Sequence, residues 1–424
     1  VDNENLPKGS NPALVTKDNI VAVSGGIMQQ VGGIYYPSGT GIGYSIDGGL
    51  TWNYKFQPID PIPEDGVYDD INWGGQIIKH LSVTTEINNI SYDLAIIGDY
   101  IYSTSWAGGL RRFKFRNLNI VPPEEDPNPW EIIPLPMDNQ YTLYCGSIDE
   151  TTYELNPNDP INGGSHNHKG FSVYSNNDST IWVGTAAGIN KGIIDQETNC
   201  INWEHYNAIT HGFSGNWVIG FNHQNINEYT RIWAITWSTG GTETNAVSYS
   251  DDYGDTWNIV SQIEEYNIKV YNIFTIDNLV YLSTQNGLYV SYNGDYWTKF
   301  QAIEDNNGQI ILSEIIYTSL FTNINGEDDN AIWVGTPDGI ARTYNNGIDW
   351  EIFRFWEPVS DHSSSESNFY AYPNPFYIND INQYNNNGHV RFVFDEVNNN
   401  SNLIIYNFAM EKVIKLSNPN IVDN

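Results

Sequence analysis

The pentapeptide IWVGT occurs twice in this 424-residue chain, at residues 181–185 and 332–336. Related cores begin at four other places: IVAVS at Ile20, IYSTS at Ile101, IWAIT at Ile232 and VYLST at Val280. Each is a short run of β-branched and aromatic residues, which is typical of a buried strand. The last four cores start 51, 48 and 52 residues apart. The chain therefore contains a repeat of about 50 residues, and that repeat determines how the fold is interpreted.

The segments around each core predict a small antiparallel sheet. A turn containing glycine and a second alternating strand follow the later cores, as in AAGINKGI, QNGLYVSY and PDGIARTY. A tryptophan with a short outer run comes next, as in TWNYKF, TWNIV, YWTKF and DWEIF, and another apolar strand precedes each later core. Four short strands in about 50 residues are the signature of a β-propeller blade. The sequence therefore predicts an all-β protein.

The number of blades follows from counting the repeats. Six cores and six closing tryptophans predict a six-bladed β-propeller, and seven blades stay open as an alternative. The first two intervals between cores are 81 and 80 residues. We expect their excess to form long loops in two insertions, the first at residues 57–76 and the second at residues 137–170. IIKHLSVTTEI from Ile77 could instead be a strand of a concealed blade. The closing tryptophans are Trp52, Trp130, Trp203, Trp257, Trp297 and Trp350.

The composition changes after the propeller, which we place at residues 1–357. Residues 358–368 are polar and rich in serine, as in a linker. Residues 369–424 then alternate at period two in FYAYPNPFYIND, HVRFVF and NLIIYNF, which suits the first strands of a small β-sandwich. The chain has room for only part of such a domain. An open sheet edge could accept a strand from another chain, so self-assembly through this domain is one hypothesis.

One eight-residue turn recurs between strands and fits the pattern SxDxGxTW. SIDGGLTW spans residues 45–52, SDDYGDTW spans 250–257, and TYNNGIDW at 343–350 is a degenerate copy. An aspartate here can accept hydrogen bonds from backbone amides, a glycine tolerates positive φ, and the tryptophan packs between sheets. A catalytic centre is needed once, whereas a turn is needed in every blade, so we interpret the motif as structural. Its residues are Ser45, Asp47, Gly49, Thr51 and Trp52, and Ser250, Asp252, Gly254, Thr256 and Trp257.

This turn resembles the Asp-box, or BNR repeat, of sialidases, sortilin-like receptors and secreted bacterial propellers. With YPNPF at residues 372–376, nearly the whole chain resembles secreted bacterial propeller proteins that end in an immunoglobulin-like sorting domain for type IX secretion. The resemblance implies a partial immunoglobulin-like domain, contact with that secretion machinery during export, and a secreted or cell-surface location in a Gram-negative relative of the Bacteroidetes. The WDG turn and GVY strand typical of such domains do not occur before Asn424. We expect that removal after export, or a shortened chain, explains this.

Charge limits the classes of partner. The chain has 18 Lys and Arg against 51 Asp and Glu, for a net charge of −33. Such a balance repels phosphate backbones and anionic membrane surfaces. No apolar run approaches the roughly 18 residues that span a bilayer. We therefore expect neither a nucleic-acid partner nor membrane insertion.

The alternative to a binding protein is a glycoside hydrolase, because sialidases and some glucanases are propellers with the same turn. A sialidase-like site would need three converging arginines, and the strand positions of Arg111 and Arg112 do not suit that. The loop acids Asp69, Asp70, Glu124, Glu125, Glu243, Glu327, Asp328 and Asp329 offer no distinct catalytic pair. We expect no catalytic residues, no metal site and no cofactor, with calcium near residues 327–330 as a weaker option. His166 and His168 in SHNH fit a solvated loop better than a metal site without a visible third ligand.

Two features suggest binding and stabilisation. Trp106 and Trp237 follow repeated cores, at the propeller end that usually carries ligands, so they could be platforms for a sugar ring or a peptide. The alternative is that each packs against a neighbouring blade. Cys145 and Cys200 could form a disulfide that joins the second insertion to the third blade. The sequence thus favours a non-catalytic binding, adhesion or assembly module whose partner is an extracellular glycan or protein.

Overall fold

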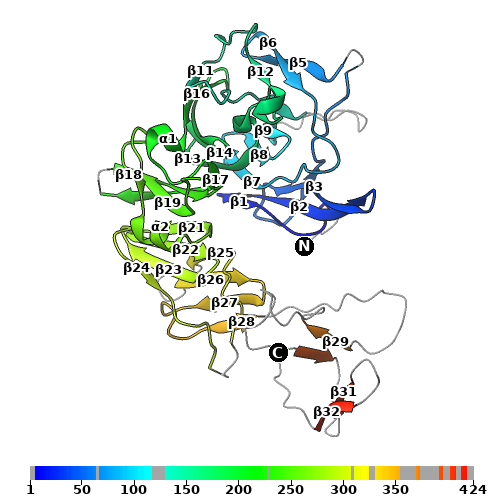
Figure 1. The fold of residues 1–424 in the computed structure, drawn as a ribbon, viewed down its shortest axis with the longest axis vertical. Helices are drawn as coiled ribbons and strands as arrows, with labels where there is room; N and C mark the ends of the chain where they lie inside the picture. The colour runs from blue at the N-terminus through cyan, green and yellow to red at the C-terminus, as the bar shows by residue number, and fades with distance from the viewer. Residues whose placement is uncertain are drawn as a thin grey trace. The chain divides into compact units, whose positions relative to one another are not determined.

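The computed structural model describes residues 5–63, 66–116, 129–227, 229–306, 310–323 and 330–353, and four short strands beyond them. Almost all regular structure is β (Figure 1). The helices of these residues are single turns or little more, and none has the length and apolar character needed to cross a bilayer. They are η1 (Pro160–Asn162), η2 (His166–His168), α1 (Ala208–His211) and α2 (Ser261–Tyr266).

Six sheets follow one another along the chain, each built from hairpins of consecutive strands. The first three contain β1 (Leu14–Lys17), β2 (Ile20–Val31), β3 (Ile34–Ser45) and β4 (Asn53–Lys55); β7 (Asp93–Ile97), β8 (Tyr100–Ser105), β9 (Gly109–Lys114) and β10 (Glu131–Ile133); and β13 (Gly170–Asn177), β14 (Thr180–Thr185), β15 (Gly188–Ile194) and β16 (Ile201–Tyr206). The next three contain β17 (Trp217–Ile226), β18 (Tyr229–Trp237), β19 (Ala246–Ser250) and β20 (Asn258–Ile259); β21 (Val270–Ile276), β22 (Leu279–Thr284), β23 (Gly287–Tyr292) and β24 (Trp297–Lys299); and β25 (Thr318–Asn323), β26 (Asn330–Thr336), β27 (Gly339–Thr343) and β28 (Glu351–Phe353).

Each repeated core lies in the second strand of its sheet, which confirms the strand order predicted from the repeat. The second strand has a hydrogen-bonded neighbour on both sides, and β14 also packs against the sheet before it on one face and the sheet after it on the other. A continuous apolar run suits that environment better than alternation does. β14 is accordingly buried along its whole length.

Consecutive sheets pack through their first strands: β1 against β7, β7 against β13, β13 against β17, and β17 against β21. A cavity of about 430 Å³ lies among β1, β7 and β13, where Val15, Ala95 and Tyr174 line it. Sheets of four hairpin-connected strands that pack in series in this way form a β-propeller. The fold class predicted from the repeat is thus correct, and the count of six or seven blades stays a prediction.

The closing tryptophan of one sheet packs against the core tryptophan of the sheet before it. Trp257 meets Trp182 edge to face at 6.3 Å between ring centroids, and Trp297 meets Trp233 in the same way at 6.3 Å. The turn glycine lies on the same ring, because a Cβ added to Gly254 would come within 3.0 Å of the Trp182 ring. Gly254 also has φ +100°, a backbone conformation that favours glycine. Trp182 and Trp233, the second residues of the third and fourth cores, therefore each have a defined partner in the next sheet.

The two insertions do not form only loops, contrary to the sequence-based expectation. β5 (Tyr68–Trp73) from the first insertion, β6 (Gln76–Leu81), which begins at the last residue of that insertion, and β12 (Glu154–Leu155) from the second insertion form a three-stranded sheet. β12 runs parallel to β6. β11 (Thr142–Leu143) adds a fifth strand beside β16. Segments from two distant insertions complete one sheet, which a search for strands within a single repeat cannot detect. The strand at Ile77 therefore belongs to this small sheet of three strands.

Two compact units divide the chain: Val1–Thr284 with Tyr289–Thr298, and Gln285–Leu288 with Lys299–Asn424. The second unit includes β29 (Phe369–Tyr372) paired with β30 (Arg391–Phe394), and β31 (Asn402–Tyr406) paired with β32 (Lys412–Ser417). The predicted linker and residues 373–376 of YPNPF lie outside the described residues. The boundaries at 357 and 369 and the immunoglobulin-like sandwich stay predictions.

Candidate functional site

The SxDxGxTW turn at residues 250–257 is closed by hydrogen bonds among its own residues. Asp252 accepts from the backbone N of Thr256 at 2.8 Å, from Thr256 Oγ1 at 2.6 Å and from Ser250 Oγ at 2.8 Å. Ser250 Oγ accepts from Gly254 N at 2.7 Å, and Trp257 Nε1 donates to Gly254 O at 3.1 Å. Burial alone would raise the pKa of Asp252, yet the hydrogen bonds from Thr256 lower it. These bonds occupy the carboxylate, which favours a structural role over a catalytic one.

The other copies of the turn are built in the same way. At residues 45–52, Asp47 accepts from Thr51 N at 2.9 Å and Thr51 Oγ1 at 2.7 Å, and these bonds lower its pKa to about 2. In the degenerate copy, Asn345 takes the place of the aspartate and accepts from Asp349 N at 2.9 Å. An amide oxygen can therefore accept the backbone hydrogen bond of this turn in place of a carboxylate.

Asp252→Ala should lower the free energy of unfolding by about 1–2 kcal/mol, because it removes an ionised acceptor of three hydrogen bonds from a largely exposed turn. Asp252→Asn should cost clearly less, because its oxygen can accept from Thr256 N as Asn345 does. Urea unfolding of both variants measures the difference. Equal losses for the two substitutions would contradict this account of the turn.

Trp106 and Trp237 both pack against the neighbouring sheet, and both keep part of their surface exposed. The Trp106 ring lies 5.4 Å from that of Phe171 and 5.8 Å from that of Trp217. Trp237 Nε1 donates to Val270 O at 2.8 Å. Packing and ligand contact are therefore not exclusive alternatives for these two side chains.

The structure places four further aromatic residues beside them, each near the start of a first strand. Trp217 faces Trp237 in the β17–β18 register, and Tyr271 lies 5.7 Å from Trp237 between ring centroids. In an antiparallel hairpin the first strand starts where the second ends, so these side chains gather at the same end of the strands in successive sheets. All six are half-buried or, for Tyr92, 36% exposed. We call this set the aromatic arc: Tyr92, Trp106, Phe171, Trp217, Trp237 and Tyr271.

Two lysines flank the aromatic arc in a strongly acidic chain. Lys169 Nζ lies 4.9 Å from the Trp106 ring centroid, and Lys269 Nζ lies 5.0 Å from that of Trp237. Lys169 is buried and paired with Asp159 at 2.5 Å, whereas Lys269 is exposed. The arc thus combines ring faces with one solvent-facing cation, an arrangement that suits sugar rings or peptide side chains.

Asp93 is one of the acids next to the aromatic arc. Burial raises its pKa to about 7, although its carboxylate accepts from Val173 N at 3.0 Å and Leu94 N at 2.9 Å. Each oxygen accepts a backbone amide, so the group fixes β7 against β13. Glycoside hydrolysis would also need a second carboxyl group about 5–9 Å away.

The sequence-based search missed four members of the arc because it considered only positions after the repeated cores. A second signal was present: YDLAI, GFSVY, NWVIG and VYNIF each carry an aromatic residue at or next to the start of a first strand. Alignment of the first strands, and not only of the second, would have brought these residues together.

The other residues considered for chemistry have structural partners. Both ring nitrogens of His168 lie near backbone groups, Nδ1 at 2.9 Å from Asn156 N and Nε2 at 3.0 Å from Leu135 O, and burial lowers its pKa. Glu243 accepts hydrogen bonds from Asn216 and Thr239, which close its loop. Among the described residues no three His, Cys, Asp or Glu side chains are grouped as metal ligands. Glu124, Glu125 and residues 327–329, including the calcium candidate, lie outside those residues.

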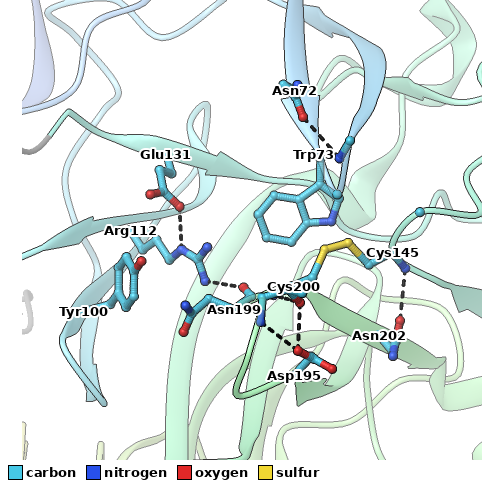
Figure 2. A pocket seen from close by; sticks show the side chains of 14 residues that line it. Asn72, Trp73, Tyr100, Arg112, Glu131, Cys145, Asp195, Asn199, Cys200 and Asn202 are labelled. Atoms are coloured by element: carbon cyan, nitrogen blue, oxygen red, sulfur yellow. Dashed lines mark hydrogen bonds and ion pairs between the residues drawn. A yellow bond between two sulfur atoms is a disulfide. The ribbon is translucent and has the colours of Figure 1, made fainter.

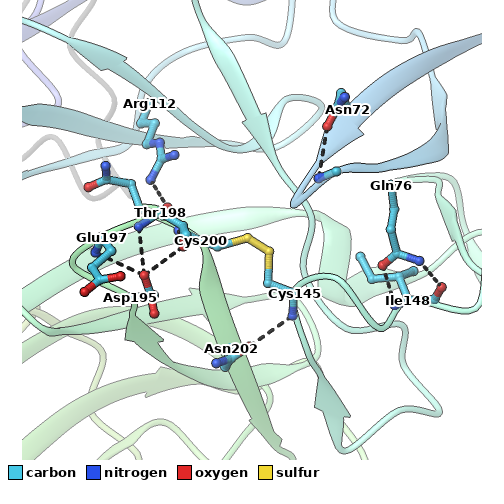
Figure 3. Close-up of a disulfide and its surroundings, with 12 residues drawn as sticks. Asn72, Gln76, Arg112, Cys145, Ile148, Asp195, Glu197, Thr198, Cys200 and Asn202 are labelled. Carbon is cyan, nitrogen blue, oxygen red and sulfur yellow. Dashed lines mark hydrogen bonds between the residues drawn. A yellow bond between two sulfur atoms is a disulfide. The ribbon is translucent and has the colours of Figure 1, made fainter.

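Cys145 and Cys200 form a disulfide in the structure, with Cα atoms 6.0 Å apart (Figure 3). The backbone N of Cys145 donates to Asn202 Oδ1 at 3.0 Å. Gln76 holds the same insertion by exchanging hydrogen bonds with the backbone of Ile148 at 2.7 and 2.8 Å. The second insertion is thus attached both to β16 and to the start of β6.

A cavity of about 590 Å³ opens beside the disulfide (Figure 2). We call it the rim pocket; its residues come from the two insertions and the residues next to them, from β8, β9 and β10, and from the β15–β16 turn with the start of β16. Arg112 Nε donates to Glu131 Oε2 at 2.7 Å, and Arg112 Nη1 donates to Asn199 O at 2.8 Å. The residues that line it include Asn72, Trp73, Arg112, Glu131, Asn199 and Asn202.

No protein-family model matches the chain, and none of the curated proteins matches it. Similar solved structures include the extracellular domain of a hybrid two-component system from B. thetaiotaomicron, at 12% identity and TM-score 0.45, covering 87% of this chain and 38% of that one. PorZ, a bacterial surface component of the type IX secretion system of Porphyromonas gingivalis, is 13% identical with TM-score 0.47, covering 81% and 41%. YCF48 from Cyanidioschyzon merolae is 14% identical with TM-score 0.45, covering 82% and 86%. This chain thus spans about two fifths of the first two structures, and the fold assignment rests on its own strand order and packing.

Proposed function

We propose that this protein is an exported, non-catalytic binding module, secreted or held at the surface of a Gram-negative bacterium, and that the aromatic arc is its ligand surface. The observation that carries the proposal is the arc itself. Aromatic side chains from four successive sheets lie at the same end of their strands and stay partly exposed. Core packing alone does not require exposed ring surface on every one of these sheets.

The chemistry of the arc favours an extracellular glycan or protein as ligand. Ring faces bind the apolar face of a sugar or a peptide side chain, and tryptophan dominates many binding hot spots. Lys269 adds a cation beside Trp237 that would bind an acidic group on the ligand. The surrounding excess of carboxylates would repel polyanions such as nucleic acids.

Export is proposed on the resemblance of the C-terminal segment to type IX sorting domains. The machinery of that pathway would then be a transient partner, and an open sheet edge of the C-terminal strands could support assembly with other copies. Adhesion and assembly are both compatible with a rigid propeller that carries its binding surface, the aromatic arc, at one end of its strands. Catalysis is not part of the proposal, because the acids beside the arc already have partners: Asp93 accepts from backbone amides, Asp159 pairs with Lys169, and Glu243 accepts from Asn216 and Thr239.

Trp106→Ala should weaken ligand binding at least tenfold, since truncation of a central aromatic anchor typically costs about 2 kcal/mol or more. A glycan array identifies the ligand, and a reducing-sugar release assay on the same glycan tests for hydrolysis. Trp333→Ala is the matched control, because Trp333 is half-buried like Trp106, lies on a second strand like Trp237 and stacks on Phe353 at 5.8 Å, but is outside the arc.

We expect binding without release in the unmodified protein, loss of binding in Trp106→Ala and Trp237→Ala, and unchanged binding in Trp333→Ala. Thermal unfolding of all three variants separates lost contact from lost packing. Release of reducing ends would overturn the proposal in favour of a hydrolase. Equal binding by Trp106→Ala and Trp333→Ala would overturn the assignment to the arc.

A further inference from the structure

We infer that the rim pocket is a second binding site, separate from the aromatic arc, and that it takes a neutral sugar residue. The inference concerns different residues from the proposed function and does not depend on it. The pocket lies among β8–β10, the β15–β16 turn and the insertions, whereas the arc lies where first strands begin. Its volume of about 590 Å³ falls within the range of small-molecule sites.

Arg112 gives the rim pocket a buried polar side chain that is held in one position. Its side chain is 5% exposed, and its guanidinium lies 4.4 Å from the Tyr100 ring centroid. Three of its five N–H donors are used, by Glu131, by Tyr102 OH at 3.0 Å and by Asn199 O. Within the described part of the chain, Nη2 forms no hydrogen bond. A buried, rigidly held guanidinium therefore lines the cavity with two donors left for a ligand (Figure 2).

Three amide side chains surround the same cavity. Asn72 Oδ1 accepts from Gly75 N at 3.2 Å, and Asn202 Oδ1 accepts from Cys145 N at 3.0 Å. Each oxygen is thus fixed by a backbone donor, and the two Nδ2 groups have no partner among the described residues. The side-chain amide of Asn199 likewise has no partner among those residues. The backbone of Asn199 is at φ +57°, and its backbone carbonyl accepts from Arg112. The pocket therefore offers several oriented N–H groups and few free charges.

Charge selects the class of ligand. Glu131 neutralises Arg112 across 2.7 Å, so the guanidinium is not a free anion site. Asp195, on the rim, accepts from Thr198 N and Thr198 Oγ1, both at 2.8 Å, and these bonds lower its pKa. The chain carries a net charge of −33, which disfavours anions generally. Both carboxylates already have partners, so a cation would have to displace them.

A polar ligand without charge that uses many hydrogen bonds is a polyhydroxyl compound. Adjacent sugar hydroxyls can accept from Arg112 Nη2 and donate to the second oxygen of Glu131, while the amides contact the remaining hydroxyls. The Trp73 ring is only 5% exposed and Arg112 stacks on Tyr100, so ring stacking adds little. Binding through hydrogen bonds in an open pocket should be weak, with a Kd of about 1 mM for a single residue.

Titration of the complete protein with glucose, galactose, mannose, N-acetylglucosamine and glucuronate, followed by NMR, tests the inference. At least one neutral sugar should saturate, and glucuronate should bind more weakly. Asn199→Gly should weaken the neutral sugar at least fivefold, because it removes the amide while glycine keeps the positive φ. Asn346→Gly, at an exposed asparagine with φ +56° outside the pocket, is the control and should bind like the unmodified protein.

Glu131→Gln provides an independent readout. It leaves the charge of Arg112 uncompensated, so affinity for glucuronate should rise at least fivefold relative to the neutral sugar. Failure of every neutral sugar to bind, or equal binding by Asn199→Gly and Asn346→Gly, would overturn the inference. Trp106→Ala should leave these titrations unchanged, which separates this result from that of the aromatic arc.

Discussion

We expect Arg111→Met to lower the free energy of unfolding by about 3–5 kcal/mol, because it leaves the carboxylate of Asp60 buried without its countercharge. Arg111 Nη2 donates to Asp60 Oδ1 at 2.6 Å and to Thr84 Oγ1 at 2.8 Å, and both charged side chains are at most 5% exposed. Burial alone would raise the pKa of Asp60, but the charge and the hydrogen bond of Arg111 lower it. Urea unfolding measures the loss.

Two variants separate the buried charge from other effects of the substitution. Lys79→Met breaks the exposed pair with Asp70, whose side chains are 55% and 54% exposed, and should cost less than about 1 kcal/mol. Replacing both buried partners, Arg111→Met with Asp60→Leu, should recover much of the loss, because no unpaired charge remains. A double variant as unstable as Arg111→Met would show that shape, and not charge, dominates at this site.

Cys145→Ser with Cys200→Ser should lower the free energy of unfolding by about 4 kcal/mol in the chain-entropy account of a crosslink. The bridged residues are 55 positions apart, so the loop that it closes is long. The loss should concentrate in the second insertion and in the small sheet of β5, β6 and β12, which the disulfide holds near β16. Hydrogen exchange should show faster exchange there than in β14.

Intact mass before and after reduction checks the premise of that prediction. A protein with the disulfide gains two daltons on reduction. A protein with free thiols keeps its mass, and that result would contradict the Cys145–Cys200 disulfide. The same double serine variant should also lose sugar binding at the rim pocket, because both cysteines line it. The aromatic arc contains no residue of the second insertion, and Phe171, on β13, is its only member between the two cysteines in the sequence that the structure describes.

Much of the propeller could be predicted because its signals are local. The core IWVGT marks a strand by its side chains alone, and SxDxGxTW closes through bonds within eight residues, such as Thr256 N to Asp252. The small sheet was not predictable in this way, because β12 joins β6 from 75 or so positions further along the chain. A two-residue strand such as Glu154–Leu155 has no pattern of its own and forms only where a preformed edge receives it.

The candidate sites show the same division. Trp106 and Trp237 could be singled out from their place after the cores, whereas Phe171 and Trp217 became relevant only when neighbouring sheets brought them within 5.1 Å of each other. Arg112 was set aside as a strand residue, since nothing next to it in sequence indicates Glu131 or Asn199 as partners. Sequence alone thus determined the repeating sheets and their SxDxGxTW turns, because strand propensity and turn hydrogen bonds act over a few residues. Tertiary structure decided the aromatic arc, the buried Arg111 pair and the rim pocket, because each needs side chains from separate sheets whose spacing is set by how those sheets pack.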